Sequence, residues 1–215
     1  MTDQFSGTGL ACFRGGRMVF AGLEFRLQPG EAIVLRGPNG SGKSSLLRIM
    51  AGLLQPAAGA LAWHDASVTD EPEIHFSRLH YVGHHDAVKP VLTVSENVGF
   101  WARLRGKGDG VASALDAFAI GNLADVPGRF LSAGQKRRVN LARILAHPAP
   151  LWLLDEPTTA LDQDTIGRFE RALARHRAGG GMVVASTHTE IALDDARVLN
   201  LAEFQAEEVF DAGIH

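Results

Sequence analysis

The segment GPNGSGKSS, residues 37–45, has residue types and spacing that suit phosphate binding. It fits the pattern G-x-x-x-x-G-K-S/T from Gly37 to Ser44. Glycines allow a tight loop whose backbone N–H groups point at phosphate oxygens, and Lys43 adds a cation for the β- and γ-phosphates. The Ser44 hydroxyl can ligate Mg²⁺. We therefore expect a nucleotide-binding loop made of Gly37, Pro38, Asn39, Gly40, Ser41, Gly42, Lys43, Ser44 and Ser45.

A second chemical motif, LWLLDEP at residues 151–157, ends an apolar run with two acids. Asp155 is placed to bind Mg²⁺ directly or through a water molecule, and Glu156 to polarise an attacking water. Two acids after an apolar run are otherwise typical of a solvated strand end. The phosphate-binding pattern elsewhere in the chain favours the catalytic interpretation.

Short apolar runs predict the elements that must position these groups. EAIVLRG at 31–37 is followed by helical spacing at 44–54, which indicates a strand, a loop and a helix. APLWLLDEP at 149–157 and GGGMVVASTH at 179–188 predict two more buried strands of a parallel sheet. Residues 93–146 lack such runs and should be mainly helical, with a break at 125–134. The fold class is therefore α/β.

Composition narrows the classes of protein. A chain of 215 residues that is 46% hydrophobic suits a single domain, residues 1–215. The net charge of −3 provides no general attraction to nucleic acid, so we expect no nucleic-acid partner. Cys12 is the only cysteine and cannot form an internal disulfide, which favours a reducing, cytosolic setting. The apolar runs are shorter than the ~20 residues of a membrane-spanning helix. The triplet Gly179–Gly181 is expected to be a flexible joint.

Four motifs in order, GPNGSGKSS, LSAGQKRR, LLDEPTTALD and STH, resemble the nucleotide-binding subunits of ABC transporters. The resemblance runs from about Leu10 to Leu199. It implies a RecA-like P-loop NTPase core of the ABC type, with an N-terminal antiparallel β element and a helical subdomain at about residues 86–135. It also implies ATP and Mg²⁺ as cofactors.

On this resemblance, residues 131–135 are the signature loop, normally L-S-G-G-Q, with Ala133 replacing its first glycine. Ser132 should cap the helix that follows, whose N–H groups suit a γ-phosphate. The resemblance implies that this phosphate belongs to ATP held by a second copy, in a symmetric head-to-tail dimer. It assigns contacts across that interface to Ser132, Gly134, Gln135 and Asp162, and catalytic roles to Lys43, Glu156 and a switch histidine, His188.

Two assignments stay open. The family stacks an aromatic ring on adenine, and counting along the chain places Arg14 at that position, with Phe13 adjacent. Either side chain can stack on the base. Phe13 is equally suited to the apolar core. Where the family has a glutamine that contacts Mg²⁺ and water, the stretch YVGHHDAVKP offers His84 by spacing and His85 by a G-H-Q pattern. The histidine pair is alternatively structural, or a separate transition-metal or haem site.

Two further stretches have competing interpretations. The basic run Lys136, Arg137, Arg138 and Arg143 is interpreted as a solvated helix face. The stretch 88–101, rich in apolar residues, is expected to form part of a groove that receives a short helix from a membrane subunit. Its alternative is an internal core helix.

Within the superfamily, the wording of YVGHHDAVKPVLTVSENVGFW, LSAGQKRRVNLARILA and LWLLDEPTTALD is most similar to the ATPase subunits of haem exporters in bacterial cytochrome c maturation. That resemblance implies polytopic membrane subunits as partners and a peripheral place on the cytoplasmic face of the bacterial inner membrane. Alternatives are another small ABC exporter, a soluble ABC ATPase of DNA repair or translation, and a non-enzymatic nucleotide-binding module. The intact pair Asp155–Glu156 argues against the last.

Overall fold

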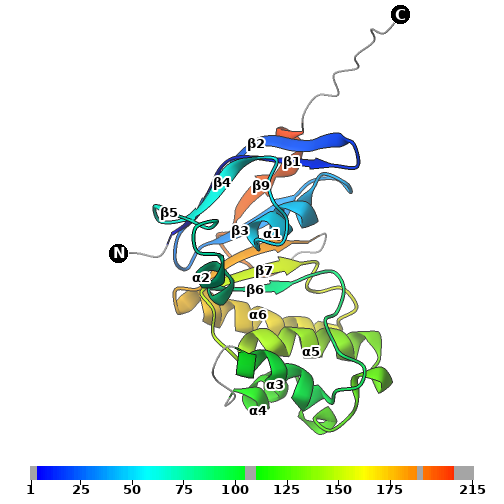
Figure 1. Cartoon of the computed structure of the whole chain (residues 1–215). Coiled ribbons are helices and arrows are strands. Elements are labelled where there is room, and N and C mark those ends of the chain that lie inside the picture. The colour runs from blue at the N-terminus through cyan, green and yellow to red at the C-terminus, as the bar shows by residue number, and fades with distance from the viewer. Residues whose placement is uncertain (1–3, 105–109, 188–190, 206–215) are drawn as a thin grey trace, which may run out of the picture.

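The computed structural model describes residues 4–104, 110–187 and 191–205. Its strands form two sheets, and helices lie between the sheets and below the second one (Figure 1). The first sheet is antiparallel and has the order β2-β1-β4-β5. Its strands are β1 (Phe5–Arg14), β2 (Arg17–Leu27), β4 (Ala58–Trp63) and β5 (Ala66–Ser67).

The second sheet is parallel, with the order β6-β7-β8-β3-β9. The three strands expected from continuous apolar runs lie next to one another at its centre, which confirms the predicted α/β class. The strands are β3 (Ala32–Arg36), β6 (Leu79–Val82), β7 (Leu151–Asp155), β8 (Met182–Ser186) and β9 (Arg197–Asn200).

Helices fill the remaining sequence, including the stretch expected to be helical. The predicted break appears as the 3₁₀ turn η2 (Gly128–Phe130) before the longest helix of that stretch. The α-helices are α1 (Lys43–Met50), α2 (Pro72–Ser77), α3 (Val94–Leu104), α4 (Val111–Ala117), α5 (Ala133–Leu145) and α6 (Gln163–Ala178); two further 3₁₀ turns are η1 (Gly121–Leu123) and η3 (Leu201–Phe204).

Two apolar cores lie on opposite faces of the parallel sheet because alternate strand residues point to opposite sides. Leu151 and Leu153 of β7 pack with α1 and the antiparallel sheet. Trp152 and Leu154 of the same strand pack with residues of α3, α5 and α6. Helix α1 therefore lies between the two sheets, which fixes the phosphate loop at its N-terminus (Figure 1).

The glycine triplet is not a flexible joint, so that prediction was wrong. The N–H of Gly179 donates to the carbonyl of Arg175 at 3.2 Å, and the N–H of Gly181 donates to the carbonyl of His176 at 2.9 Å. These bonds end α6 and lead directly into β8, because glycine accepts the positive φ of 86° found at Gly180. Within the described ranges no helix is both long and apolar enough to cross a membrane.

Candidate nucleotide site

The phosphate loop leaves β3 and enters α1 as expected. Gly42, the residue immediately before α1, has φ 99°, and a Cβ there would lie 2.7 Å from Cγ1 of Val19. Glycine is therefore required by both backbone and space. The Lys43 ammonium folds back over the loop and donates to the carbonyl oxygens of Gly37 at 2.8 Å and Pro38 at 3.0 Å. A cation thus lies at the mouth of the loop.

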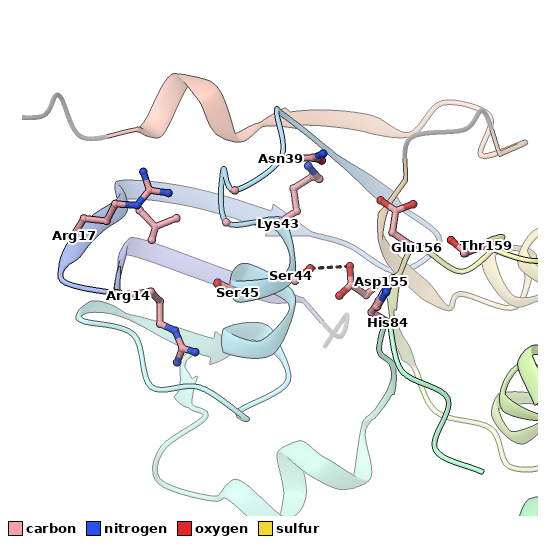
Figure 2. A pocket seen from close by; sticks show the side chains of 14 residues that line it. Arg14, Arg17, Asn39, Lys43, Ser44, Ser45, His84, Asp155, Glu156 and Thr159 are labelled. Atoms are coloured by element: carbon pink, nitrogen blue, oxygen red, sulfur yellow. Dashed lines mark hydrogen bonds between the residues drawn. The ribbon is translucent and has the colours of Figure 1, made fainter.

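Two acids lie beside this loop, at the end of β7. The Ser44 hydroxyl donates to Oδ1 of Asp155 at 3.1 Å, drawn as a dashed line in Figure 2. The Ser186 hydroxyl, from β8, donates to the same oxygen at 2.6 Å. Glu156 has φ 49°, and its N–H donates to the Ser186 carbonyl at 3.1 Å. The hydroxyl of Ser44 and the carboxylate of Asp155 therefore offer neighbouring oxygen atoms of the kind that a hard divalent cation binds.

These groups line one open cavity of about 730 Å³ (Figure 2). The structure brings together there most residues expected to hold nucleotide, namely Arg14, Asn39, Gly40, Gly42, Lys43, Ser44, Ser45, His84, Asp155 and Glu156. Ser41 is buried within the loop and does not line the cavity, and neither do Gly37 and Pro38. Sequence reasoning missed Gly15, Arg17, Val19 and Thr159. The pair of glycines between Arg14 and Arg17 was the available signal, because two glycines predict a hairpin turn that brings its flanks together.

The two histidines of the stretch YVGHHDAVKP, His84 and His85, line different cavities. His84 lines the nucleotide cavity and lies just below Asp155 in Figure 2. His85 lines a separate cavity of about 470 Å³ with Tyr81, Trp101 and other residues. The two rings are 5.3 Å apart. In the part of the chain that the structure describes, no three His, Cys, Asp or Glu side chains cluster as metal ligands. The geometry therefore favours His84 for the glutamine position.

At the other end of the cavity, Arg14 and Phe13 behave differently. Arg14 lines the cavity, whereas Phe13 does not and is 55% exposed. The interpretation of Phe13 as a core residue was therefore wrong, because the side chain lies beyond the packed part of the hairpin. Arg14 and Arg17 are direct partners across the turn between β1 and β2.

Helix α5 begins with a capping box formed by the predicted signature residues. The Gln135 N–H donates to the Ser132 hydroxyl at 3.2 Å, and the Ser132 N–H donates to Oε1 of Gln135 at 2.8 Å. These residues line a second cavity, of about 610 Å³, together with Gly134 and Asp162. Hydrogen bonds from Thr165 hold the pKa of Asp162 below its ordinary value, with a smaller contribution from Arg138. Asp162 therefore stays ionised.

The solvated-face interpretation was wrong for Arg137 and Arg143, which are only 3% and 8% exposed. Arg143 donates to the carbonyl of Tyr81 at 2.6 Å, and its guanidinium lies 4.7 Å from the centre of the Trp101 ring. The guanidinium groups are buried because the strand ends beside α5 present carbonyl oxygens that need donors. A signal existed, since Arg137 lies four and seven residues before the buried Leu141 and Ile144.

Arg137 holds two loops of the site together. Its guanidinium donates to the carbonyl oxygens of Gly83 at 2.9 Å, Asp155 at 3.0 Å and Pro157 at 3.1 Å, and also to that of Glu156. Nη1 lies 3.3 Å from Oδ1 of Asp86. The switch histidine expected at 188 lies outside the described residues.

The stretch 88–101 is divided between the core and the surface. Val94 and Val98 are fully buried against the helices, as the core alternative requires. Val91 is 74% exposed, and Phe100 is partly exposed. Only Trp101 of this stretch lines the 470 Å³ cavity, whose rim includes the exposed Leu53 and Phe76.

Comparison with known proteins defines the class. Residues 20–159 match the family model described as ABC transporter. Two curated relatives are each called cytochrome c biogenesis ATP-binding export protein CcmA. The protein from Rhodospirillum rubrum is 61% identical over 98% of this chain and 91% of its own length. The protein from Paramagnetospirillum magneticum is 59% identical over 97% of this chain and 99% of its own length. The chain belongs to the ABC transporter family, as an ATP-hydrolysing subunit.

Solved structures agree with the fold. A putative ABC transporter ATP-binding protein from Pyrococcus furiosus has a TM-score of 0.81 at 22% identity, over 94% of this chain and 100% of that one. A bacterial Atm1-family ABC exporter with ATP bound has a TM-score of 0.82 at 23% identity, over 96% of this chain and 38% of that one. The expected ABC-type fold is confirmed. Family membership implies ATP as the nucleotide, membrane subunits as partners, and dimerisation.

Proposed function

We propose that this chain is the ATPase subunit of the haem exporter used in c-type cytochrome biogenesis. The observation that carries the proposal is the identity of 61% and 59% with relatives named for cytochrome c biogenesis, along almost the whole of each chain. Hydrolysis would drive conformational change in separate membrane subunits, the partners that membership of the ABC transporter family implies.

The nucleotide site follows from the cavity geometry. Ser44 and Asp155 would hold Mg²⁺, which neutralises charge on the β- and γ-phosphate oxygens when it is bound. The phosphate loop binds the phosphates through backbone N–H groups, and Lys43 adds its positive charge. Glu156 accepts a proton from the attacking water. His84, which lines the same cavity as Asp155, orients that water. His188 is proposed as the contact to the γ-phosphate.

The second cavity is proposed to complete the site in a head-to-tail dimer. Its residues, Ser132, Gly134, Gln135 and Asp162, line a hollow distinct from the nucleotide cavity of the same chain. The capped N-terminus of α5 offers N–H groups and a positive dipole end to a γ-phosphate held by the other copy. Two composite sites would result, each made from both copies.

The membrane partner is proposed to dock at the 470 Å³ cavity. Its lining combines apolar Leu53, Phe76 and Trp101 with the guanidinium of Arg143, which suits an amphipathic helix from a membrane subunit. We propose that the chain, as one domain of residues 1–215 with a helical part at about 86–135, lies peripherally on the cytoplasmic face of the bacterial inner membrane.

Complementation tests the proposal. A bacterium that lacks its own relative of this chain would be given the wild type, Lys43→Ala or Arg26→Gln, and covalent haem attachment to a c-type cytochrome would be measured by haem staining. The wild type and the Arg26→Gln control, altered at an exposed residue of β2, should restore the cytochrome, whereas Lys43→Ala should not. A wild-type protein that hydrolyses ATP with the membrane subunits but restores no cytochrome would overturn the assignment.

A further inference from the structure

Two arginines face each other at the tip of the β1–β2 hairpin. Arg14 and Arg17 are direct Cα partners, joined by Gly15 and Gly16 with φ of 58° and 78°. Two consecutive residues with positive φ form the hairpin turn whose twist matches antiparallel strands. Like charges placed directly opposite on paired strands repel and destabilise the pair. Neither guanidinium forms an ion pair with any carboxylate of the described residues.

This hairpin tip faces the nucleotide cavity, and both arginines line it. Figure 2 shows their side chains leaving the tip in different directions. The Arg17 side chain lies against the phosphate loop, where its Nη2 is 3.7 Å from the position that a Cβ on Gly40 would occupy. The Arg14 side chain extends past the other side of the hairpin, away from the loop. The two positive charges therefore reach different ends of the cavity.

The base end of this cavity lacks a ring. Among its described lining residues no side chain is Phe, Tyr or Trp. A guanidinium plane can stack on a base, and it also binds phosphate oxygens through two parallel N–H bonds. An unpaired arginine that lies against a phosphate loop is suited to the second of these contacts, since an anion there would also relieve its repulsion with its partner.

We propose that Arg17 is a second cationic ligand of the polyphosphate chain, acting with Lys43, while Arg14 alone covers the base. The inference rests on the proposed binding of ATP in this cavity. It divides the affinity for ATP into a base-independent part that requires Arg17 and a base-dependent part that requires Arg14.

The test compares Mg²⁺-ATP with inorganic tripolyphosphate, which has three linked phosphates and neither ribose nor base. Titration calorimetry would measure both ligands with the wild type, Arg17→Gln, Arg14→Gln and the control Arg26→Gln. A lost hydrogen-bonded charge contact corresponds to roughly a ten-fold to hundred-fold weaker Kd. Arg17→Gln should weaken both ligands by a similar factor. Arg14→Gln should weaken ATP alone, and Arg26→Gln neither.

Two outcomes would overturn the inference. In the first, Arg17→Gln binds tripolyphosphate with the Kd of the wild type. In the second, Arg14→Gln weakens the binding of tripolyphosphate as much as the binding of ATP. Matching thermal unfolding curves would show that the variants are folded. Lys43→Ala separates the two proposals, because ATP binding that survives this change contradicts the nucleotide site itself. Loss of binding in Lys43→Ala together with normal binding of both ligands by Arg17→Gln contradicts only the role of Arg17.

Discussion

Glu156, the residue proposed to activate water, has an uncommon backbone conformation. A left-handed φ of 49° is unusual for a non-glycine residue and persists only where surrounding contacts impose it. Glu156→Gln should keep ATP affinity within about two-fold while hydrolysis falls at least ~100-fold, because the phosphate loop is intact and the base is lost. Phosphate release and nucleotide binding would be measured on one preparation. The exposed Glu24→Gln serves as control, and hydrolysis by Glu156→Gln above a tenth of the wild-type rate would contradict the assignment.

His84 and His85 are adjacent but line different cavities, so they make a matched pair. Replacing His84 by Ala should lower kcat roughly ten-fold or more and change KM little, since one water-orienting hydrogen bond is removed. His84→Gln should retain most activity, because an amide also donates and accepts. His85→Ala should hydrolyse ATP like the wild type. Steady-state kinetics of the four proteins would decide, and equal effects at both positions would refute the distinction.

His75 joins α1, α2 and the antiparallel sheet through a neutral ring. Its Nδ1 accepts from Nε1 of Trp63 at 2.9 Å, so Nε2, 3.0 Å from the Met50 carbonyl, carries the proton. Burial lowers the pKa of His75 to about 4. Below pH 6.5 His75 binds a proton in the unfolded chain but stays neutral in the folded chain. The free energy of unfolding therefore decreases as the pH falls toward 4.

The loss assigned to His75 between pH 7 and pH 4.5 should be on the order of 2–3 kcal/mol. Urea unfolding at both pH values would measure it for the wild type, His75→Gln and the exposed control His85→Gln. His75→Gln should depend less steeply on pH than either other protein. The same slope in all three would contradict the explanation. His176, whose pKa burial also lowers to about 4, adds to the decline in every variant.

Among single residues, the sequence predicted those that belong to a short motif with a fixed local backbone conformation. Lys43, Ser44, Asp155 and Glu156 could be predicted because the phosphate loop and the strand end each have a local sequence pattern, although the contact between the two depends on the order of the strands in the sheet. Arg17 was missed because its position depends on the register of a hairpin. Arg137 was misplaced because burial of a charge depends on carbonyl groups from distant strands, which a local charge pattern does not reveal.

Among the elements, α5 is held at its start by the capping box and along its length by Arg137. Arg137→Met preserves the alkyl volume but removes the donor to several carbonyl groups, while Asp86 keeps the hydrogen bond from the Asn140 amide. We expect the free energy of unfolding to fall by about 3–5 kcal/mol, because several carbonyl oxygens lose their donor at once and each such loss costs about 1–3 kcal/mol. Chemical denaturation would measure this loss, with Lys136→Met as the control on the same helix. A loss below about 1 kcal/mol would show that water replaces the guanidinium.

The elements that could be predicted are those with strong periodicity. β3, β7 and β8 are buried on both faces and have continuous apolar runs. β6 (LHYV) and β9 (RVLN) were missed because they are four-residue edge strands with mixed polarity. Their place in the sheet depends on pairing with neighbours rather than on their own residues.

In the whole molecule, the nucleotide cavity and the cavity at Ser132 are separate hollows, so the proposed composite site requires two copies. Glu156→Gln with Mg²⁺-ATP should shift from monomer to dimer in light scattering. Adding Ser132→Glu should abolish the dimer without weakening ATP binding to the monomer, because a carboxylate at the start of α5 repels the incoming γ-phosphate. The double variant remaining dimeric would refute this arrangement, and Ser113→Glu, on another helix, is the control.

Arg137 has a mechanical consequence at this scale. One flat, fully bonded group ties the segment that starts at Gly83 to the segment from Asp155 to Pro157. The first segment continues into His85, which lines the cavity proposed for the membrane subunit. The second carries Glu156. Because Arg137 bonds to both segments, we expect a displacement of the first segment to move Glu156 as well. A membrane subunit bound at the 470 Å³ cavity would then change the position of the proposed water-activating carboxylate.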